Sequence, residues 1–247
     1  MKFYYRSILL FFGIICLGLS VILFKEIRIG AQTLPPDVGL VTQLSGEASY
    51  WNEAYQKTPE KAQAFMKIRR GDHFKITSGA MIQLVYFQNG RQETWKGSAE
   101  LVVGDVQSRI EGEKGIQAQP QVLILPSETS QGMRRIPVLL RRARLSRSGA
   151  TQVRGTGETP PKTIIPSREE RAEIAMARET YQKLRKQTKA DEITPELNLL
   201  AVLADYEQFD EMEKVIKEAL KIQPDNEVLK DLEEWVRAQK SKPATKK

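Results

Sequence analysis

Four acidic side chains beside predicted β turns have the chemical type that hydrolysis requires. They are Asp72, Glu93, Glu100 and Asp105. Two carboxyl groups held a fixed distance apart can act as general acid and general base, or as acid and nucleophile, on a glycosidic bond. The spacing along the chain does not single out one pair of the four. A hydrolase that uses paired carboxylates is therefore one hypothesis for the function.

Other catalytic arrangements lack the residues they need. Cys16 is the only cysteine and His73 the only histidine in the chain. A disulfide framework and a cysteine-based zinc site are therefore excluded, and so is a histidine-rich metal site. A Ser-His-Asp triad would have to use His73, which we expect to be a surface side chain. We expect no cofactor and no metal centre.

Arginine is concentrated in one short stretch in the middle of a chain with net charge +7. The stretch RRIPVLLRRARLSR contains the candidate partner-binding residues, namely Arg134, Arg135, Arg141, Arg142, Arg144 and Arg147. One interpretation is attraction to an anionic partner, such as phospholipid head groups, teichoic or nucleic acid, or an acidic protein. The other is a pair of strands whose arginines are simply solvated.

The amino terminus carries the signal for location. Residues 7–24 form an uncharged run of 18 residues, which as a helix would span roughly 27 Å, close to a bilayer core. A cleaved signal peptide is the alternative, because 29–31 could serve as a cleavage site. Basic residues before the run favour a cytoplasmic amino terminus. We predict a single-pass protein of the inner (cytoplasmic) membrane with most of the chain periplasmic or extracytoplasmic, where nucleic acid is not an expected partner.

Short β-prone runs separated by turn residues fill positions 38–103. The Asn89-Gly90 pair is the strongest turn signal, because tight hairpin turns need positive φ. The run 80–87 is apolar on both faces, which predicts a central strand of a sandwich. The piece 58–68 is predicted to be a short helix or irregular crossover that buries Phe65 and Ile68.

The order of these turns resembles the FecR-like domain of bacterial periplasmic proteins. The resemblance rests on Gly39-Leu40-Val41, Gly46, Arg70-Gly71-Asp72, Ser78-Gly79-Ala80, Asn89-Gly90 and Ser98-Ala99-Glu100-Leu101. Val153-Arg154-Gly155-Thr156 is similar to an element that closes such domains. The resemblance implies an all-β domain of short strands and a non-catalytic role in the envelope.

From Ser167 onward the apolar period becomes helical. Ser167 and Glu170 form a capping box, and Thr194, Asp210 and Asp225 are the predicted N-caps of three further helices. Residues 193–226 resemble one tetratricopeptide repeat, a 34-residue helical hairpin. An ordinary helical hairpin is the alternative. Such a repeat implies a groove that binds peptide segments of other proteins.

Together these observations predict an α+β multidomain chain with a transmembrane helix, a FecR-like β domain and a C-terminal tetratricopeptide-like hairpin. The boundaries are a cytoplasmic tail at 1–6, an anchor at 7–24, a juxtamembrane linker at 25–37, the β domain at 38–157, a linker at 158–167, the helical region at 168–240 and a basic tail at 241–247. We expect a non-catalytic scaffold that binds envelope proteins or cell-wall components. An envelope hydrolase with paired carboxylates is the alternative.

Overall fold

The computed structural model describes residues 34–111, 119–147 and 166–241. The predicted anchor at 7–24 and the Val-Arg-Gly-Thr element at 153–156 lie outside the described residues. Within the described ranges, none of the helices combines the length and the apolar composition that crossing a bilayer requires.

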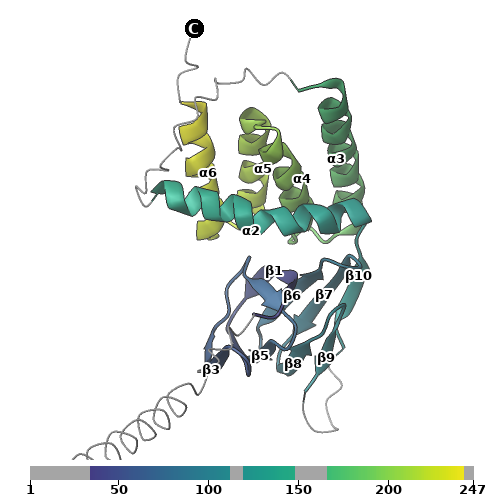
Figure 1. Cartoon of the computed structure of the whole chain (residues 1–247), viewed down its shortest axis with the longest axis vertical. Coiled ribbons are helices and arrows are strands. Elements are labelled where there is room, and N and C mark those ends of the chain that lie inside the picture. Colours follow the sequence, from purple (N-terminus) through teal and green to yellow (C-terminus); the bar gives the residue numbers. More distant parts are fainter. Residues whose placement is uncertain (1–33, 112–118, 148–165, 242–247) are drawn as a thin grey trace, which may run out of the picture. The chain divides into compact units, whose positions relative to one another are not determined.

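Two antiparallel β-sheets make up residues 37–124 (Figure 1). One sheet has the order β10-β7-β6-β1-β4, with strands Gln121–Ile124, Arg91–Lys96, Met81–Tyr86, Asp37–Ser45 and Lys67–Arg69. The other has the order β3-β2-β5-β8-β9, with strands Gln56–Lys61, Ala48–Asn52, His73–Ile76, Ala99–Val103 and Ser108–Ile110. Both sheets contribute to one apolar core, so the predicted region of short strands is confirmed as two packed sheets.

Strand β6 has the central position in its sheet, as its two apolar faces predicted. Ile82, Leu84 and Tyr86 point into the core shared by the two sheets. Val85 and the following Phe87 belong instead to the core formed with the helices. The strand is apolar on both faces because one face packs on a sheet and the other on helices.

The prediction of a short helix at 58–68 is wrong, and that of an irregular crossover holds only for 62–66, which link β3 of one sheet to β4 of the other. This piece supplies the end of β3 and the start of β4, although Phe65 and Ile68 are buried as expected. Strand β3 is exposed and lies at a sheet edge, where Pro59 interrupts no ladder on its free side. Because an exposed edge strand is polar on both faces, its sequence lacks the alternation of apolar and polar residues by which a strand is predicted.

Five helices are described after the strands. They are α2 (Ser127–Arg147), α3 (Arg168–Gln187), α4 (Thr194–Asp205), α5 (Phe209–Ile222) and α6 (Glu227–Lys240). Helix α2 contains the whole arginine stretch, so the interpretation of that stretch as a strand pair is wrong. The β structure ends at Ile124, well inside the range predicted as a β domain.

The apolar residues of α2 explain why it is a helix. Met133, Ile136, Leu140 and Ala143 are buried, and their spacing of three and four residues forms one stripe along a helix. A strand would have placed alternate residues of this stretch on opposite faces and left part of this set in water. Packing on both the sheet and the other helices thus selects the helical state.

The helix starts differ in detail from the sequence prediction. The capping box of Ser167 and Glu170 is confirmed. Helix α4 begins at Thr194 itself, with Ile193 at the N-cap position, and α5 is preceded by Gln208, which makes no side-chain cap. Asn226, one residue after the predicted Asp225, caps α6 by accepting hydrogen bonds from two backbone amides.

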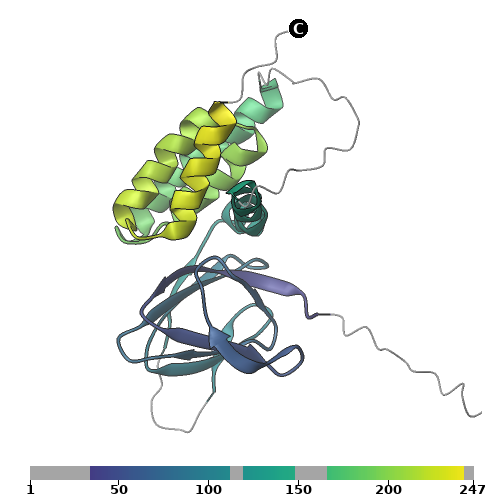
Figure 2. The ribbon, with the colours of Figure 1, turned by 90° about the vertical axis from the view of Figure 1, so that its left-hand side faces the viewer.

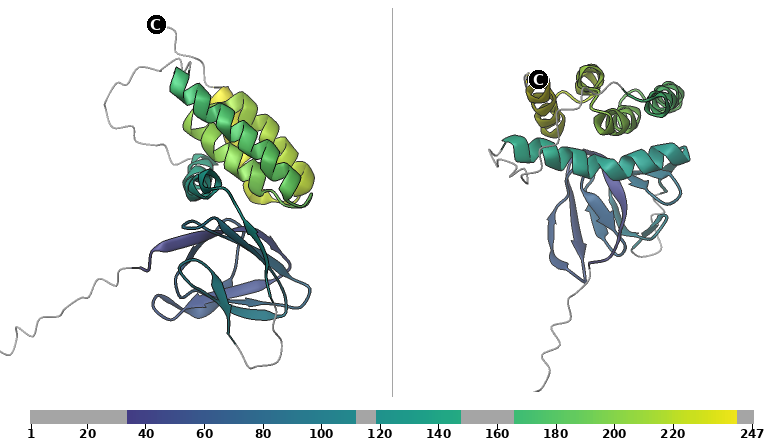
Figure 3. Two further views of the ribbon diagram at one scale, coloured as in Figure 1. Left: turned by 90° about the vertical axis from the view of Figure 1, so that its right-hand side faces the viewer. Right: turned by 45° about the horizontal axis from the view of Figure 1, so that its top comes forward.

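Helix α2 lies between the strands and the other helices and runs crosswise to them (Figures 1, 2 and 3). On one side it contacts β1 and β6, and on the other it contacts α4 and α6. A single apolar cluster runs through this layer, from Leu40 and Val85 of the sheet to Leu200 of α4 and Leu232 of α6. The helices and the sheet therefore share a core.

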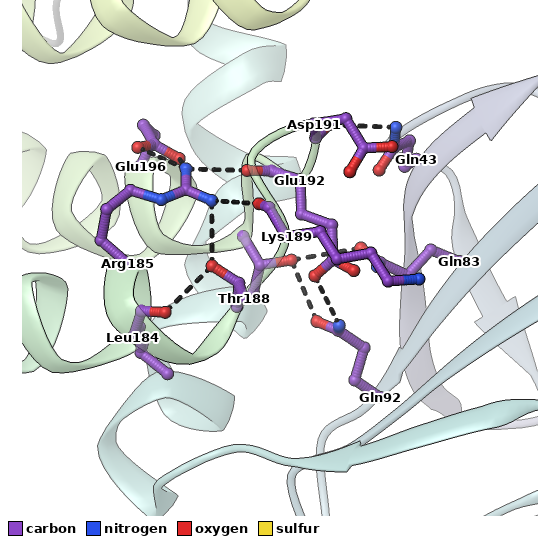
Figure 4. A network of polar contacts seen from close by, with 11 residues as sticks. Gln43, Gln83, Gln92, Leu184, Arg185, Thr188, Lys189, Asp191, Glu192 and Glu196 are labelled. Atoms are coloured by element: carbon purple, nitrogen blue, oxygen red, sulfur yellow. Dashed lines mark hydrogen bonds and ion pairs between the residues drawn. The ribbon is translucent and has the colours of Figure 1, made fainter.

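A buried polar network joins the sheet to the loop between α3 and α4 (Figure 4). The Thr194 hydroxyl donates to Gln92 Oε1 at 3.0 Å and lies 3.2 Å from Gln83 Oε1. Gln92 Nε2 donates to Glu192 Oε2 at 3.0 Å. Because buried polar groups are costly unless they are paired, these contacts fix where the loop meets the sheet.

The β6–β7 hairpin confirms the predicted turn at Asn89-Gly90 and provides a stability test. Gly90 has φ of +65°, and a Cβ added there would lie 2.5 Å from the carbonyl oxygen of Leu125. We expect Gly90→Val to lower the free energy of unfolding by about 2 to 4 kcal/mol, because it adds a backbone clash to the strain of positive φ. Urea unfolding followed by circular dichroism measures this change.

Gly79→Val is the matched control for this prediction. Gly79 has φ of +78°, but an added Cβ would meet no atom within 4 Å. Only the backbone strain applies, so we expect a loss of roughly 1 to 2 kcal/mol. Equal losses at the two positions would mean that the contact between Gly90 and Leu125 has no energetic role.

Candidate functional site

The six candidate arginines have different environments along α2. Arg135 forms an ion pair with Asp205 at 2.5 Å and lies 3.7 Å from Glu173, so it ties α2 to the other helices. The Arg134 guanidinium stacks over the ring of Phe87, 5.2 Å from the ring centroid. Arg147 ends the helix, and its side chain lies outside the described part. These arginines therefore do not act as one cluster.

The remaining arginines lie on the exposed side of α2. Arg141, Arg142 and Arg144 are exposed and form no ion pair with another described residue. With Arg134 and the exposed apolar side chains Val138 and Leu145 they make up what we call the basic face of α2. Arg141 and Arg144 also border a groove of about 470 Å³, whose apolar lining includes Phe65, Met66 and Leu140.

A second and larger groove runs between α2 and α3, with α4 as its floor. Its volume is about 860 Å³. The apolar part of its lining is Ala172, Met176, Ala177 and Val202, and its charged part is Glu128, Arg135, Glu169, Glu173, Glu179 and Lys183. Met176 is 58% exposed although it is a large apolar side chain. We call this the α2–α3 groove.

Asn198 provides an unusual polar group in the lining of this groove. The side chain is 2% exposed, and its Oδ1 atom has no hydrogen-bond partner in the described structure. Gly132 of α2 approaches it so closely that a Cβ there would lie 2.4 Å from Oδ1. Glycine therefore allows α2 to pack on α4 at this point. An unpartnered buried amide is a candidate for hydrogen bonding to a ligand.

The charge of the α2–α3 groove is negative. It has four carboxylates against two cationic groups, and both cationic groups are already paired, Arg135 with Asp205 and Lys183 with Glu179. Glu128 and Glu169 form no ion pair with another described residue. A partner with positive charge beside an apolar side chain would complement this groove.

The four carboxylates considered for hydrolysis are held by separate partners. Asp72 is fully buried and accepts hydrogen bonds from Asn52, Tyr55 and the Arg69 amide. Burial, followed by the hydrogen bond to Asp72, raises the pKa of Tyr55 to about 12, so Tyr55 stays a donor. The sequence-predicted turn at Asp72 is therefore fixed by a buried hydrogen-bond set.

Glu93 is also fully buried in the sheet. It accepts hydrogen bonds from Arg91 at 2.6 Å and from the Trp95 indole at 3.0 Å, and the Ser108 amide lies within bonding distance. The other two carboxylates make exposed ion pairs, Glu100 with Lys75 and Asp105 with Arg70. The structure does not join any two of these four through a shared side-chain partner.

His73 in β5 has a side chain only 16% exposed, so the expectation of a surface side chain holds only in part. Its ring stacks on Trp51 with centroids 5.0 Å apart, and Nδ1 contacts the carboxylate of Glu111. In the described ranges no group of three or more histidine, cysteine or acidic side chains is arranged to hold a metal ion.

Comparisons of the chain with protein-family models, curated proteins and solved structures find no match. The similarities to FecR-like domains and to tetratricopeptide repeats therefore stay predictions from the sequence.

Sequence reasoning missed both grooves and the polar network. The hydrogen bonds of Thr194 to Gln83 and Gln92 join residues about a hundred positions apart in the sequence. A glutamine at an inward position of β6 was the available signal, since an isolated buried amide requires a partner. No sequence pattern indicated the two grooves, because their existence depends on how α2 packs on the rest of the structure.

Proposed function

We propose that this chain is a non-catalytic, membrane-anchored scaffold of the bacterial envelope that binds a segment of another protein in the α2–α3 groove. The segment would be short, with an apolar side chain flanked by lysine or arginine. The observation that carries the proposal is the groove itself, which is apolar at Met176 and Val202 and negatively charged at its rim.

The size and lining of the groove support a peptide as the ligand. A groove of about 860 Å³ whose lining combines apolar side chains with polar and charged groups can hold a peptide segment. The amide of Asn198 can pair with a peptide backbone, which offers both a donor and an acceptor. Glu128 and Glu169 supply the negative charge that favours a basic segment.

The helical hairpin of α4 and α5 supports the resemblance to a tetratricopeptide repeat, which we include in the proposal. Glu207, near the place where the repeat has a turn glycine, has φ of +52°. Met212, Ile216 and Ala219 are buried in α5, at the spacing with which the second helix of such a repeat packs on its first. The groove lies on the side of α4 that also contacts α3, where a repeat protein would bind a peptide.

A selection from random peptides displayed on phage tests the proposal. We expect peptides selected on the full chain to carry an aliphatic residue between basic residues. We expect Met176→Lys to weaken their binding at least about tenfold, because it places a positive charge on the α3 wall of the groove. Met176 is exposed, so the substitution should leave the fold intact. Isothermal titration calorimetry with a selected peptide measures the effect.

Ala238→Lys on α6 is the control, because it adds the same charge at an exposed position away from the groove. Peptides that bind Met176→Lys as tightly as the unaltered chain would refute the groove as the binding site. Selected peptides rich in aspartate and glutamate would refute the predicted chemistry of the partner.

A further inference from the structure

We propose that the basic face of α2, made by Arg134, Arg141, Arg142, Arg144, Val138 and Leu145, docks on an anionic phospholipid surface. This inference concerns a different surface from the α2–α3 groove. It is therefore independent of whether that groove binds a peptide.

The first argument is the charge of this face. Arg141, Arg142 and Arg144 have no carboxylate partner in the described structure, and Arg134 contacts only the ring of Phe87 among its described partners. Elsewhere on the helices, Arg135, Arg178 and Arg185 all form ion pairs. A set of exposed guanidinium groups without counter-charges attracts an anionic surface, and arginine binds phosphate through parallel hydrogen bonds.

The second argument is the apolar content of the same face. Val138 is 52% exposed and Leu145 is 42% exposed. The two are seven residues apart, so they project from the same side of the helix, among the arginines. A helix that lies on a bilayer combines basic groups for the head groups with apolar side chains for the upper acyl region.

The groove beside this face favours a lipid over an acidic protein. Arg141 and Arg144 stand at the border of a groove of about 470 Å³ lined by Phe65, Met66 and Leu140. A phospholipid presents an anionic phosphate directly next to apolar chains. The guanidinium groups can bind the phosphate while the apolar lining of the groove contacts the acyl chains. An acidic peptide would leave this apolar lining uncovered.

The third argument is where the chain enters the sheet. The carbonyl of Val38 at the start of β1 accepts a hydrogen bond from the Phe87 amide at 2.9 Å, and Phe87 is the residue beneath Arg134. The start of β1 therefore lies next to the residue on which Arg134 packs. If 7–24 spans the membrane, the 12 residues at 25–36 limit the distance between the bilayer and the start of β1 to roughly 40 Å.

A fluorescent label on the basic face tests the proposal in the full chain. Val138→Cys, in a Cys16→Ser background, carries an environment-sensitive fluorophore, and the chain is reconstituted in phosphatidylcholine nanodiscs with or without phosphatidylglycerol. We expect a blue shift, and quenching by spin-labelled lipid, only when phosphatidylglycerol is present. High salt should reverse both signals, because it screens the attraction.

The triple variant Arg141→Gln, Arg142→Gln, Arg144→Gln is expected to shift the docking equilibrium at least about tenfold toward the undocked state. The control Lys96→Gln, Arg109→Gln, Arg168→Gln removes the same charge at exposed positions elsewhere and should leave docking unchanged. Circular dichroism verifies that both variants fold.

Three results would overturn the proposal. The first is a label whose emission in anionic nanodiscs shows neither a blue shift nor quenching. The second is an equal shift in neutral nanodiscs, which would indicate apolar contact without charge recognition. The third is a shift caused by added polyglutamate but not by phosphatidylglycerol, which would assign the basic face to an acidic protein.

Discussion

Arg185→Met is expected to lower the free energy of unfolding by about 3 to 5 kcal/mol. Glu196, in α4, has a side chain only 1% exposed, and both its carboxylate oxygens lie 2.9 Å from Arg185 Nη1. The substitution removes the only cation paired with Glu196 in the described structure. A buried charge without a partner costs far more than a lost surface contact.

Arg185 has a second role, which adds to this effect. Its guanidinium also donates to the carbonyl oxygens of Lys189 and Glu192 and to the Thr188 hydroxyl (Figure 4). These contacts hold the α3–α4 loop, which carries Glu192 and leads into Thr194 at the start of α4, against the sheet. We therefore expect chemical denaturation of the variant to show a lower midpoint for both helix and strand signals.

Arg178→Met is the matched control on the same helix. Arg178 forms two hydrogen bonds to Glu211, but the Arg178 side chain is 52% exposed and the Glu211 side chain 29%. We expect a loss of no more than about 1 kcal/mol, as for other exposed pairs. The double variant Arg185→Met, Glu196→Leu should be more stable than Arg185→Met alone, because it removes the unpaired charge. Equal losses for the two arginines would contradict the buried-pair argument.

Ala219→Arg is expected to destabilise the chain by about 4 kcal/mol or more. Ala219 is fully buried in α5, so an arginine there would bring a charge and a long side chain into the packed core. The sequence predicts that Ala219 lies in a helical region joined to the β domain by a linker. On that basis alone the β domain would stay folded.

The shared core changes this expectation for the β domain. The cluster that contains Ala219 extends through α2 to Leu40 and Val85 of the sheet. We therefore expect protection of β1 and β6 in hydrogen exchange to fall together with that of the helices. Ala238→Arg, at an exposed position of α6, should change stability by about 0.5 kcal/mol or less. Full retention of the helical signal in Ala219→Arg would refute the packing of α5.

Local features of the fold could be read from the sequence. The Asn89-Gly90 turn and the capping box at Ser167 follow from interactions between residues close in the chain. The helical spacing from residue 168 onward is of the same kind. Such features are determined locally because turn geometry, capping and periodicity each involve only a few neighbouring residues. The central position of β6 depends on pairing with the distant β1, but the apolar residues on both faces of this short run predicted it.

The sequence also predicted buried apolar residues where the apolar periodicity was strong. It did not predict that the arginine stretch is helical. Residues 134–147 combine aliphatic residues with arginines and a proline, a pattern that suits an edge strand or a helix. Pro137, inside α2, would by itself argue against a helix. Tertiary contacts of Met133 and Ile136 outweighed this local preference.

What the sequence determined by itself is therefore the strands between residues 38 and 103 other than β3 and β4, the turns between them and the helices from α3 onward. With one cysteine and one histidine, it also excludes a disulfide framework and a cysteine- or histidine-rich metal site. Only the tertiary structure decided which polar and charged groups meet. The pairing of Gln92 with Glu192, the separation of the four candidate carboxylates and the two grooves beside α2 depend on one event, the packing of α2 between sheet and helices. The physical reason is that burial and long-range hydrogen bonding join residues distant in the chain, and local patterns carry no record of such pairs.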